Sequence, residues 1–211
     1  MRTFLTGFDS NLECLFEWWL GNLRKHNPGC SVCVADFGMS PKMLNRIKED
    51  SSIEFLGGSK HPVKAWFLKP ASILKATEKF GRVCWMDVDC EVLNPIEDIF
   101  EFATEDKIGL TTDHPSQHRR AYWATGVVVT NGVIPLLKEW SELTLKLKHR
   151  GDQESFAAMV GKSQRFVNEI PQDYQWLRVS LVNGKDSPTK KVIHWSGKRG
   201  KDHIIRNLIS K

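Results

Sequence analysis

The sequence predicts an α/β fold in one domain, with a mixed, mostly parallel, Rossmann-like sheet flanked by helices. Two observations predict this class. Over the first 90 residues, short apolar strands alternate with helical patterns in the order β-α-β-α-β-α-β, which is typical of a parallel sheet covered by helices. Beyond residue 90, strands follow one another with few long helices between them, which indicates a mixed sheet. The 211 residues, 41% of them hydrophobic, suffice for one substantial core.

The first two strand-helix units are predicted by alternation followed by capping signals. Residues 2–8 alternate into a strand, and Asp9-Ser10 offers N-cap oxygens for a helix with apolar positions spaced three and four apart. Residues 31–37 predict a second strand. Ser40 as N-cap and Pro41 at the first helical position then start a short second helix.

The third unit ends in two carboxylates. Residues 53–56 predict a strand, Gly57-Gly58 terminates it, and residues 64–80 carry a helical pattern. Gly81 then leads into an apolar strand that ends in Asp87-Val88-Asp89. Two carboxylates in one turn beside an apolar interior repel each other, so a cation is expected to offset them, and a divalent ion is the simplest choice. A turn with capping aspartates is the alternative.

The second half of the chain predicts shorter units. A helix that starts at residues 151–154 has acidic residues in its first turn, which suits the helix dipole. In chain order the expected elements are strands at 90–93, 107–112 and 122–130, helices at 135–149 and 151–160, and a last strand at 191–195.

Three aspartates each follow a predicted strand: Asp9, Asp36 and Asp87. Ligands of parallel sheets bind beyond the carboxyl ends of the strands, so these side chains are expected along one edge, in one crevice. For Asp9 and Asp36 a capping or turn role is the alternative, and it is the one that we favour for Asp36.

The net charge of +5 is concentrated near the C-terminal end. Residues 185–211 carry eight Lys or Arg and two Asp, which gives +6, whereas residues 1–184 carry −1. Such a basic segment attracts phosphates, nucleic acid or anionic membranes, or it is solvated surface. The sequence has no apolar run of membrane-spanning length and no phosphate-binding Gly-rich loop. We therefore expect neither a transmembrane segment nor nucleotide hydrolysis of the P-loop type.

Five cysteines form an odd set, and no secretory leader precedes residues 2–5. Both observations predict a reducing, cytoplasmic location. Cys30 and Cys33 have the Cys-x-x-Cys spacing, but no second close pair accompanies them, so a zinc or redox function is disfavoured.

Four sequence pieces stand in a diagnostic order: Asp87-x-Asp89 after a strand, residues 124–127 within a strand, Asp152-Gln153 at a helix start, and His194-x-x-Gly197 before a lysine. Together they resemble the GT-A-fold glycosyltransferases of the glycogenin and bacterial lipopolysaccharide galactosyltransferase group (family 8), from residue 1 to about residue 201.

The resemblance implies an activity and a division of the chain. The activity is metal-dependent transfer of a sugar from a nucleotide donor, UDP-linked in such enzymes, to an acceptor hydroxyl with retention of configuration. Residues 1–90 would form the nucleotide-binding half, and residues 91–211 the donor-sugar and acceptor half with the basic segment. The acceptor would be a glycan, a lipid-linked molecule or a protein, and no nucleic acid is expected. The loop at residues 113–123 is a candidate for the acceptor site.

The resemblance also implies roles for matching residues. Asp87 would contact the ribose and the metal, while Asp89 and His194 would ligate Mn²⁺ or Mg²⁺, ions that accept carboxylates and an imidazole. Asp152 and Gln153 would contact donor-sugar hydroxyls near the reacting carbon. The alternative for His194 is a hydrogen-bonded, half-buried histidine without a metal. The alternative for Asp152 is a residue that caps the helix.

The remaining implied residues would bind the donor. The family places Lys-Pro-Trp three residues after the glycine that matches Gly197. This chain has Gly-Lys-Asp there, at residues 200–202, so the sequence does not identify which basic residue binds the diphosphate. For Lys69 an ordinary surface lysine is the alternative. The implied set is Thr6, Phe8 and Asp9 at the base, Thr125 and Gly126 beneath the sugar, and Lys69, Gly197, Lys198, Arg199 or Lys201 at the diphosphate.

Two other functions compete. Phosphatases of the haloacid dehalogenase type also use Asp-x-Asp at a strand end, with the first aspartate as nucleophile, but normally in the first strand, whereas three units precede it here. A noncatalytic sugar, nucleotide or nucleic-acid binding module is supported only by the aromatic residues and the basic segment.

Overall fold

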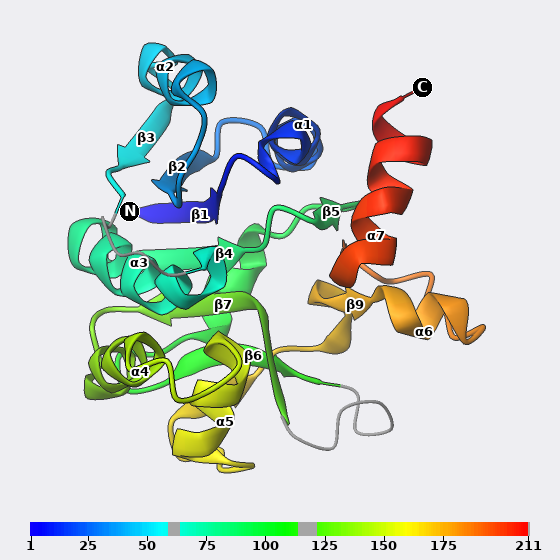
Figure 1. Ribbon diagram of the computed structural model, residues 1–211. Helices are drawn as coiled ribbons and strands as arrows, with labels where there is room; N and C mark the ends of the chain where they lie inside the picture. Colours follow the sequence, from blue (N-terminus) through cyan, green and yellow to red (C-terminus); the bar gives the residue numbers. More distant parts are fainter. Residues whose placement is uncertain (59–63, 114–121, 211) are drawn as a thin grey trace.

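The computed structural model of the chain describes residues 1–58, 64–113 and 122–210. Its larger sheet has the spatial order β3-β2-β1-β4-β7-β6-β8 (Figure 1). The neighbouring pairs that do not include β7 are parallel, and β7 runs antiparallel to both β4 and β6. The strands are β1 (Arg2–Phe8), β2 (Ser31–Asp36), β3 (Ile53–Leu56), β4 (Arg82–Met86), β6 (Ile108–Thr112), β7 (Trp123–Asn131) and β8 (Val167–Glu169).

A smaller sheet continues from the end of β4. It has the order β5-β10-β9, with β5 (Cys90–Val92), β9 (Trp176–Leu177) and β10 (Val192–His194). β10 is antiparallel to β5 and parallel to β9. The strands expected near residues 90–93 and 191–195 are therefore present, but they pair with each other outside the large sheet.

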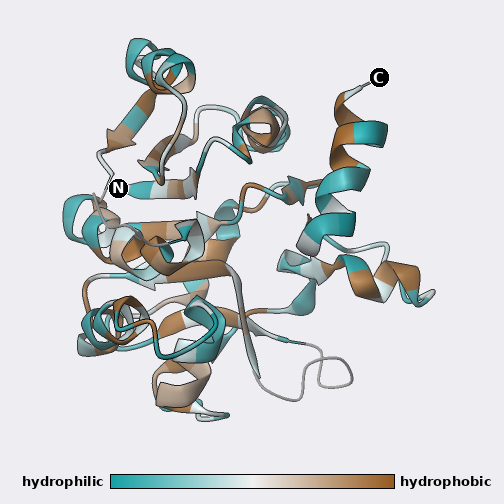
Figure 2. Ribbon diagram, in the orientation of Figure 1, coloured by the Kyte–Doolittle hydropathy of each residue, from teal (hydrophilic) through white to brown (hydrophobic). Residues whose placement is uncertain are grey.

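Helices cover both faces of the large sheet. The α-helices are α1 (Phe16–His26), α2 (Pro41–Glu49), α3 (Ala65–Phe80), α4 (Pro135–Leu145), α5 (Asp152–Val160), α6 (Arg178–Val182) and α7 (Gly197–His203). Short 3₁₀ segments are η1 (Glu13–Leu15), η2 (Glu97–Phe102) and η3 (Gln172–Tyr174), and a π-helical segment, η4 (Ile204–Ile209), follows α7. In Figure 2 the strands at the centre are coloured mostly hydrophobic, whereas the helices carry teal residues as well.

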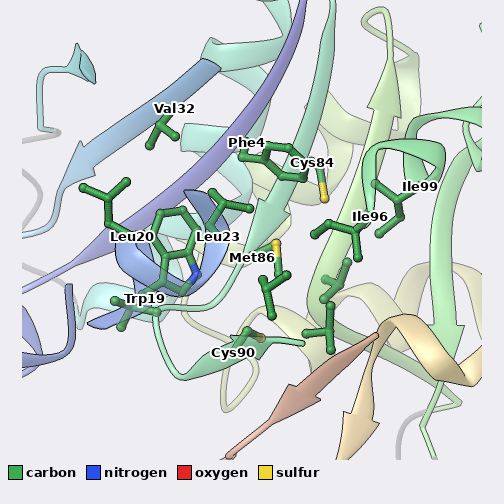
Figure 3. Close-up of a cluster of buried hydrophobic side chains, with 14 of the residues drawn as sticks. Phe4, Trp19, Leu20, Leu23, Val32, Cys84, Met86, Cys90, Ile96 and Ile99 are labelled. Carbon is green, nitrogen blue, oxygen red and sulfur yellow. The ribbon is translucent and has the colours of Figure 1, made fainter. Parts of the chain in front are cut away.

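The core has two parts, one on each face of the large sheet. One packs α1 and α2 with β5, η2 and η4, and it contains Trp19 and Leu23 of α1. The other packs α3, α4 and α5, with Trp140 as its largest helical side chain. Figure 3 shows Met86 and Cys90 in the first part, one before and one after the Asp-x-Asp turn. Both ends of that turn are therefore anchored by apolar packing.

Of the two helix N-caps predicted in the first half of the chain, one is present and the other is replaced by a turn. Ser40 accepts a hydrogen bond from the Met43 N–H at 3.2 Å, so the predicted N-cap of α2 is confirmed. The N-cap predicted from Asp9-Ser10 is wrong, because Asp9 accepts instead from the Asn11 N–H at 3.0 Å and closes a turn. The chain then enters η1 before α1 begins at Phe16. A polar side chain after a strand stabilises a turn as readily as a helix start.

One further expectation needs correction, and some elements were not predicted. The helix expected over residues 135–149 ends at Leu145, and Leu147 has φ = 55°, a left-handed conformation that does not continue a helix. β8, β9, α6 and α7 were not expected from the pattern. Within the described ranges, no helix is both long and apolar enough to cross a membrane.

The five cysteines are free thiols. Cys33 packs in the core that includes α3, whereas Cys30 packs against the core that includes α1, so the two residues lie on opposite faces of the sheet. The Cys-x-x-Cys spacing therefore does not bring the two thiols to the same face of the sheet.

Candidate functional site: a carboxylate-rich pocket at the edge of the sheet

A pocket of about 260 Å³ opens at the carboxyl ends of β1 and β4. It is bounded by the start of β7, the first turn of α5 and the segment from β10 into α7. Eleven predicted residues line it: Phe8, Lys69, Asp87, Asp89, Thr125, Gly126, Asp152, Gln153, His194, Gly197 and Lys201. Thr6, Asp9 and Lys198, which are also among the described residues, do not line it.

The Asp-x-Asp segment is a tight turn between the two sheets. The Cys90 N–H donates to the Asp87 carbonyl at 2.9 Å, and the Asp87 N–H donates to the Gly126 carbonyl at 2.9 Å. Asp87 is half-buried, with Oδ1 bound by the Trp85 indole N–H at 2.7 Å. Asp89 is almost wholly buried. The turn therefore presents one carboxylate to the pocket and holds the other in its wall.

The strand register brings His194 to these aspartates. In the small sheet His194 pairs with Cys90, the residue after Asp89. Its Nε2 lies 3.3 Å from Asp89 Oδ1 and 3.5 Å from Asp87 Oδ2. More than 100 residues of chain separate these groups, so the contact is made by pairing across β5 and β10 and not by local sequence.

The antiparallel direction of β7 explains why Thr125 and Gly126 belong to the site. Because β7 runs against β4, its first residues lie at the edge where β4 ends. Gly126 faces His194 closely: a Cβ at this position would lie 2.5 Å from the ring and 2.7 Å from Gln175 Nε2. Only a residue without a side chain leaves the imidazole its place.

Lys69 is a buried link and not an ordinary surface lysine. Its side chain is 6% exposed, and its Nζ lies 3.0 Å from Asp87 Oδ1 and 2.8 Å from Asp152 Oδ2. It also donates to the Thr125 carbonyl at 3.1 Å. Burial lowers its pKa, but the charges of Asp152 and Asp87 raise it further, so that Lys69 stays an ammonium. Three partners match its three N–H donors.

Asp152 and Gln153 begin α5, as predicted. Asp152 is buried and accepts from the Thr125 hydroxyl at 2.6 Å, besides its ion pair with Lys69. A carboxylate at a helix N-terminus is stabilised by the helix dipole. Gln153 donates to Asp113 Oδ2 at 2.8 Å, so its amide is held beside the end of β6. The first turn of α5 thus reaches both the lysine link and the second half of the sheet.

Among the described Lys and Arg residues of the C-terminal segment, Lys201 is the one that forms an ion pair with Asp89. Its Nζ lies 2.6 Å from Asp89 Oδ2. Lys198 and Arg199, at the start of α7, are exposed. The backbone at Gly200 packs directly against the Trp195 carbonyl oxygen, which a Cβ at this position would overlap. The backbone has no room for a side chain at position 200, and the next residue, Lys201, places its ammonium at Asp89.

The first loop is arranged differently from expectation. Phe8 lines the pocket, but its ring is fully buried against Phe16, so it offers no open stacking face. Thr6 is also fully buried, and Asp9 closes its own turn. Phe37, which follows β2 and stacks on Trp85 at 6.0 Å, is the half-exposed aromatic ring at this end of the pocket.

Two other residues of the site were not expected from the sequence. Trp66 lines the pocket and is 45% exposed, with its indole N–H donated to the Arg150 carbonyl at 3.2 Å. Gln175 is buried behind His194. Its Oε1 accepts from the Val127 N–H at 3.0 Å, and its Nε2 lies 3.2 Å from His194 Nδ1. Its only sequence signal is an amide side chain between the aromatic residues at 174 and 176.

The charges of the site compensate one another. Burial raises the pKa of Asp89, but the charge and hydrogen bond of His194, followed by those of Lys201, hold it below its ordinary value. For His194, burial lowers the pKa, but the charges of Asp89 and Asp87 raise it by more, so the pKa lies above its ordinary value. Asp89 therefore stays ionised beside His194 and Lys201, which supply part of the counter-charge that the sequence predicts.

The side chains at Asp87, Asp89 and His194 also fit a divalent cation. Carboxylate oxygens and an imidazole nitrogen are ligands that Mn²⁺ and Mg²⁺ accept. Asp89, Cys90 and His194 present atoms of the metal-ligating kind within 4.8 Å of one another, and Asp87 is outside that group. Burial raises the pKa of the Cys90 thiol well above its usual range, and sulfur is a soft ligand that Mg²⁺ and Mn²⁺ do not favour. The carboxylates and the imidazole are the better donors.

No protein-family model matches the sequence, and no curated protein matches it either. Solved structures match the fold. The galactosyltransferase LgtC, in complex with donor and acceptor sugar analogs, has a TM-score of 0.65 at 13% identity, over 92% of this chain and 87% of that chain. Mouse xyloside xylosyltransferase 1 has a TM-score of 0.62 at 11% identity, over 92% and 97%. The glycosyltransferase GlyE of Streptococcus pneumoniae TIGR4 has 0.66 at 14% identity, over 94% of this chain and 56% of its own.

These similarities extend over nearly the whole chain, and the mixed seven-stranded sheet with its flanking helices is the architecture that they share. The chain therefore has the GT-A fold of these glycosyltransferases, as its sequence predicts.

Proposed function

We propose that this protein is a metal-dependent glycosyltransferase that moves a sugar from a nucleotide donor, UDP-linked, to an acceptor hydroxyl. The observation that carries the proposal is the convergence of Asp87, Asp89 and His194 with the Lys69–Asp152 pair in one pocket at the carboxyl edge of a GT-A sheet. Cleavage of such a donor develops negative charge on a diphosphate, and a site with a cation held by carboxylates is suited to stabilise it.

The side chains have separate roles in this proposal. Asp87, Asp89 and His194 would hold Mn²⁺ or Mg²⁺, which when bound supplies a Lewis acid to the leaving diphosphate. Lys201 and the backbone at Gly197 border the space for the diphosphate, and Lys201 is preferred over Lys198 because it lines the pocket.

The donor sugar has its own set of candidate contacts. Asp152 and Gln153 would bind its hydroxyls, with Thr125 and Gly126 beneath it. Lys69 would hold Asp152 in place, because its three donors already have partners within the protein. Asp152 would thus act with a fixed orientation beside the reacting carbon, in a reaction that retains configuration. Phe37 would face the base, since the rings of Phe8 and Phe16 are closed to it.

The acceptor would be a glycan, a lipid-linked molecule or a protein. Part of the loop proposed to bind it, residues 114–121, lies outside the described residues. We also propose a cytoplasmic location, which five free thiols support. The chain as a whole would form one domain, because each part of the core contains residues from both halves of the sequence.

Calorimetry with UDP in the presence and absence of Mn²⁺ tests the donor assignment. We expect binding that requires Mn²⁺, and Asp89→Asn should reduce it by about tenfold or more, since a charged ligand of the metal is lost. Asp186→Asn, a change of the same kind at an exposed surface ion pair, is the control. Absence of Mn²⁺-dependent UDP binding would refute the donor assignment.

Turnover is tested by hydrolysis of a panel of sugar nucleotides. Release of UDP from one of them would distinguish an enzyme from a noncatalytic binding relative, and the configuration of the released sugar would test retention. The phosphatase alternative is not favoured, because Asp-x-Asp follows β4 of a GT-A sheet and not its first strand. Hydrolysis of p-nitrophenyl phosphate would reverse that judgement.

A further inference from the structure

Asp89 has both carboxylate oxygens in contact with protein cations or donors. Oδ1 lies 3.3 Å from His194 Nε2, and Oδ2 lies 2.6 Å from Lys201 Nζ. The side chain is 5% exposed, so water contributes little to its solvation. Lys201 is thus the closer of its two cationic partners, and a charge-assisted hydrogen bond of this length is among the stronger polar contacts in proteins.

The backbone around α7 is shaped to deliver Lys201 to this place. The Trp195 N–H donates to the Asp89 carbonyl at 3.0 Å, which ties the start of the segment to the turn. Gly197 has φ = 76°, in the left-handed region that favours glycine. Gly200 packs on the Trp195 carbonyl where no side chain fits. The first turn of α7 is therefore held close to the turn that carries the aspartates. Of the two lysines in α7, Lys198 is exposed and Lys201 lines the pocket.

Lys201 and Lys69 differ in their freedom to move. Lys69 is 6% exposed and has three partners, all within the protein. Lys201 is 28% exposed, lines the open pocket and has one carboxylate partner among the described residues. An ammonium with one partner and access to solvent can be transferred to a competing anion, whereas one with three buried partners stays in place.

We propose that Lys201 is an exchangeable counter-ion: it pairs with Asp89 in the free protein and moves to the diphosphate when a divalent cation and the nucleotide bind together. The inference rests on the proposed function and deepens it. A divalent cation at Asp89 and an ammonium at 2.6 Å from the same carboxylate would repel each other. The diphosphate brings the negative charge that the displaced ammonium needs, within the same pocket.

A thermodynamic consequence follows from this exchange. Metal alone must displace Lys201 without offering it a new partner, so its affinity for the free protein is lowered. Metal with UDP offers that partner, so each ligand strengthens the binding of the other by the same factor. Lys201 thereby makes binding of the metal and binding of the nucleotide cooperative. It also lowers the affinity of the site for a divalent cation without the nucleotide.

The test measures Mn²⁺ alone, UDP alone and both together by calorimetry. In Lys201→Met we expect Mn²⁺ alone to bind about tenfold tighter than in the native protein, because the competing charge-assisted bond is absent. UDP in the presence of Mn²⁺ should bind more weakly, so the coupling between the two ligands falls. Lys201→Arg keeps the charge and should preserve weak binding of Mn²⁺ alone. Lys185→Met, an identical change at an exposed residue of the basic segment, is the control.

The outcomes separate this inference from the proposed function. Tighter Mn²⁺ binding in Lys201→Met without any UDP binding would support the counter-ion and refute the nucleotide donor. Mn²⁺-dependent UDP binding with unchanged affinity for Mn²⁺ alone in Lys201→Met would refute the counter-ion and leave the donor assignment standing. Lys201→Gln, which keeps a hydrogen-bond donor, replaces Lys201→Met if circular dichroism shows the latter to be unfolded, and the same two comparisons then apply.

Discussion

At the residue scale, Gly126 decides how closely the imidazole of His194 can approach the aspartates. The space that a side chain would occupy is filled by His194 and by the Gln175 amide. Gly126→Ala is expected to weaken Mn²⁺-dependent UDP binding by about tenfold or more and to destabilise the fold by about 1–3 kcal/mol, because the added methyl group displaces one of these side chains. Calorimetry and urea denaturation measure the two effects.

Gly21→Ala is the matched control for this change. Nothing lies within 4 Å of a Cβ at position 21, on the exposed side of α1. The added methyl group should leave UDP binding unaltered and, through helix propensity, stabilise the protein by up to about 1 kcal/mol. Native UDP binding in Gly126→Ala would mean that His194 does not take part in the site.

Lys69 offers a second residue-scale prediction. Its removal leaves Asp87 and Asp152 in the protein without their shared ammonium. Lys69→Met should therefore lower the free energy of unfolding by about 3 kcal/mol, the usual cost of a buried charge that loses its partner. Lys75→Met, at an exposed position of the same helix, should change it by less than about 0.5 kcal/mol. Equal losses in the two variants would contradict the buried link.

The sequence predicted the residues that bear charge in the pocket better than those that orient them. Asp87 and Asp89 follow from the Asp-x-Asp motif, because carboxylates at a strand end need a counter-charge, whereas His194 was implied by the family resemblance. Gln175 and the inward position of Lys201 depend on which strands pair and on how closely two backbone segments approach. Such contacts between distant segments leave no local pattern in the chain.

At the element scale, Asp50 links the end of α2 to the start of β3. Its carboxylate accepts hydrogen bonds from the hydroxyl and from the backbone N–H of Ser52. It also forms an ion pair with Arg46, with 2.9 Å between Asp50 Oδ2 and Arg46 Nη1. The hydrogen bonds of Ser52, followed by that of Arg46, lower the pKa of Asp50 from 3.8 to about 2. A lowered pKa means that the carboxylate stabilises the fold above pH 3.8 and that this contribution is lost as the pH falls through about 2.

Asp50→Asn tests this sign. The variant should be less stable than the native protein at pH 7, by no more than about 1 kcal/mol because the pair is partly exposed to solvent. The difference should shrink as the pH falls from 3.8 to about 2, as followed by urea denaturation at a series of pH values. A constant difference across that range would show that packing, and not the charge, is responsible.

The regular elements of the first half were predictable because each has its own periodicity and punctuation. β3 (Ile53–Leu56) has the bounds expected from the pattern, and Pro41 begins α2 as expected. β9 (Trp176–Leu177) has two residues and β8 (Val167–Glu169) has three. Strands of this length show no alternation in sequence and exist only through their neighbours, so sequence patterns could not indicate them.

At the scale of the whole molecule, the thiols report whether the chain unfolds as one unit. Cys14 is exposed, whereas Cys33, Cys84 and Cys90 are buried, and burial raises the pKa of Cys33 to about 12. In the native protein a thiol reagent at pH 8 should modify Cys14 rapidly. The three buried thiols should react only as urea unfolds the chain, at the same urea concentration at which tryptophan fluorescence changes. Two separate transitions would contradict a single domain.

The position of β10 and α7 late in the chain has a consequence for how the protein is made. The aspartate turn at residues 87–90 leaves the ribosome soon after Lys69, but His194 and Lys201 follow only after about another hundred residues of synthesis. Until then Asp89 lacks the two groups that compensate its burial, and the small sheet lacks the strand that joins β5 to β9. The first half can collapse early, yet its aspartate turn can be completed only after β10 and α7 have been synthesised.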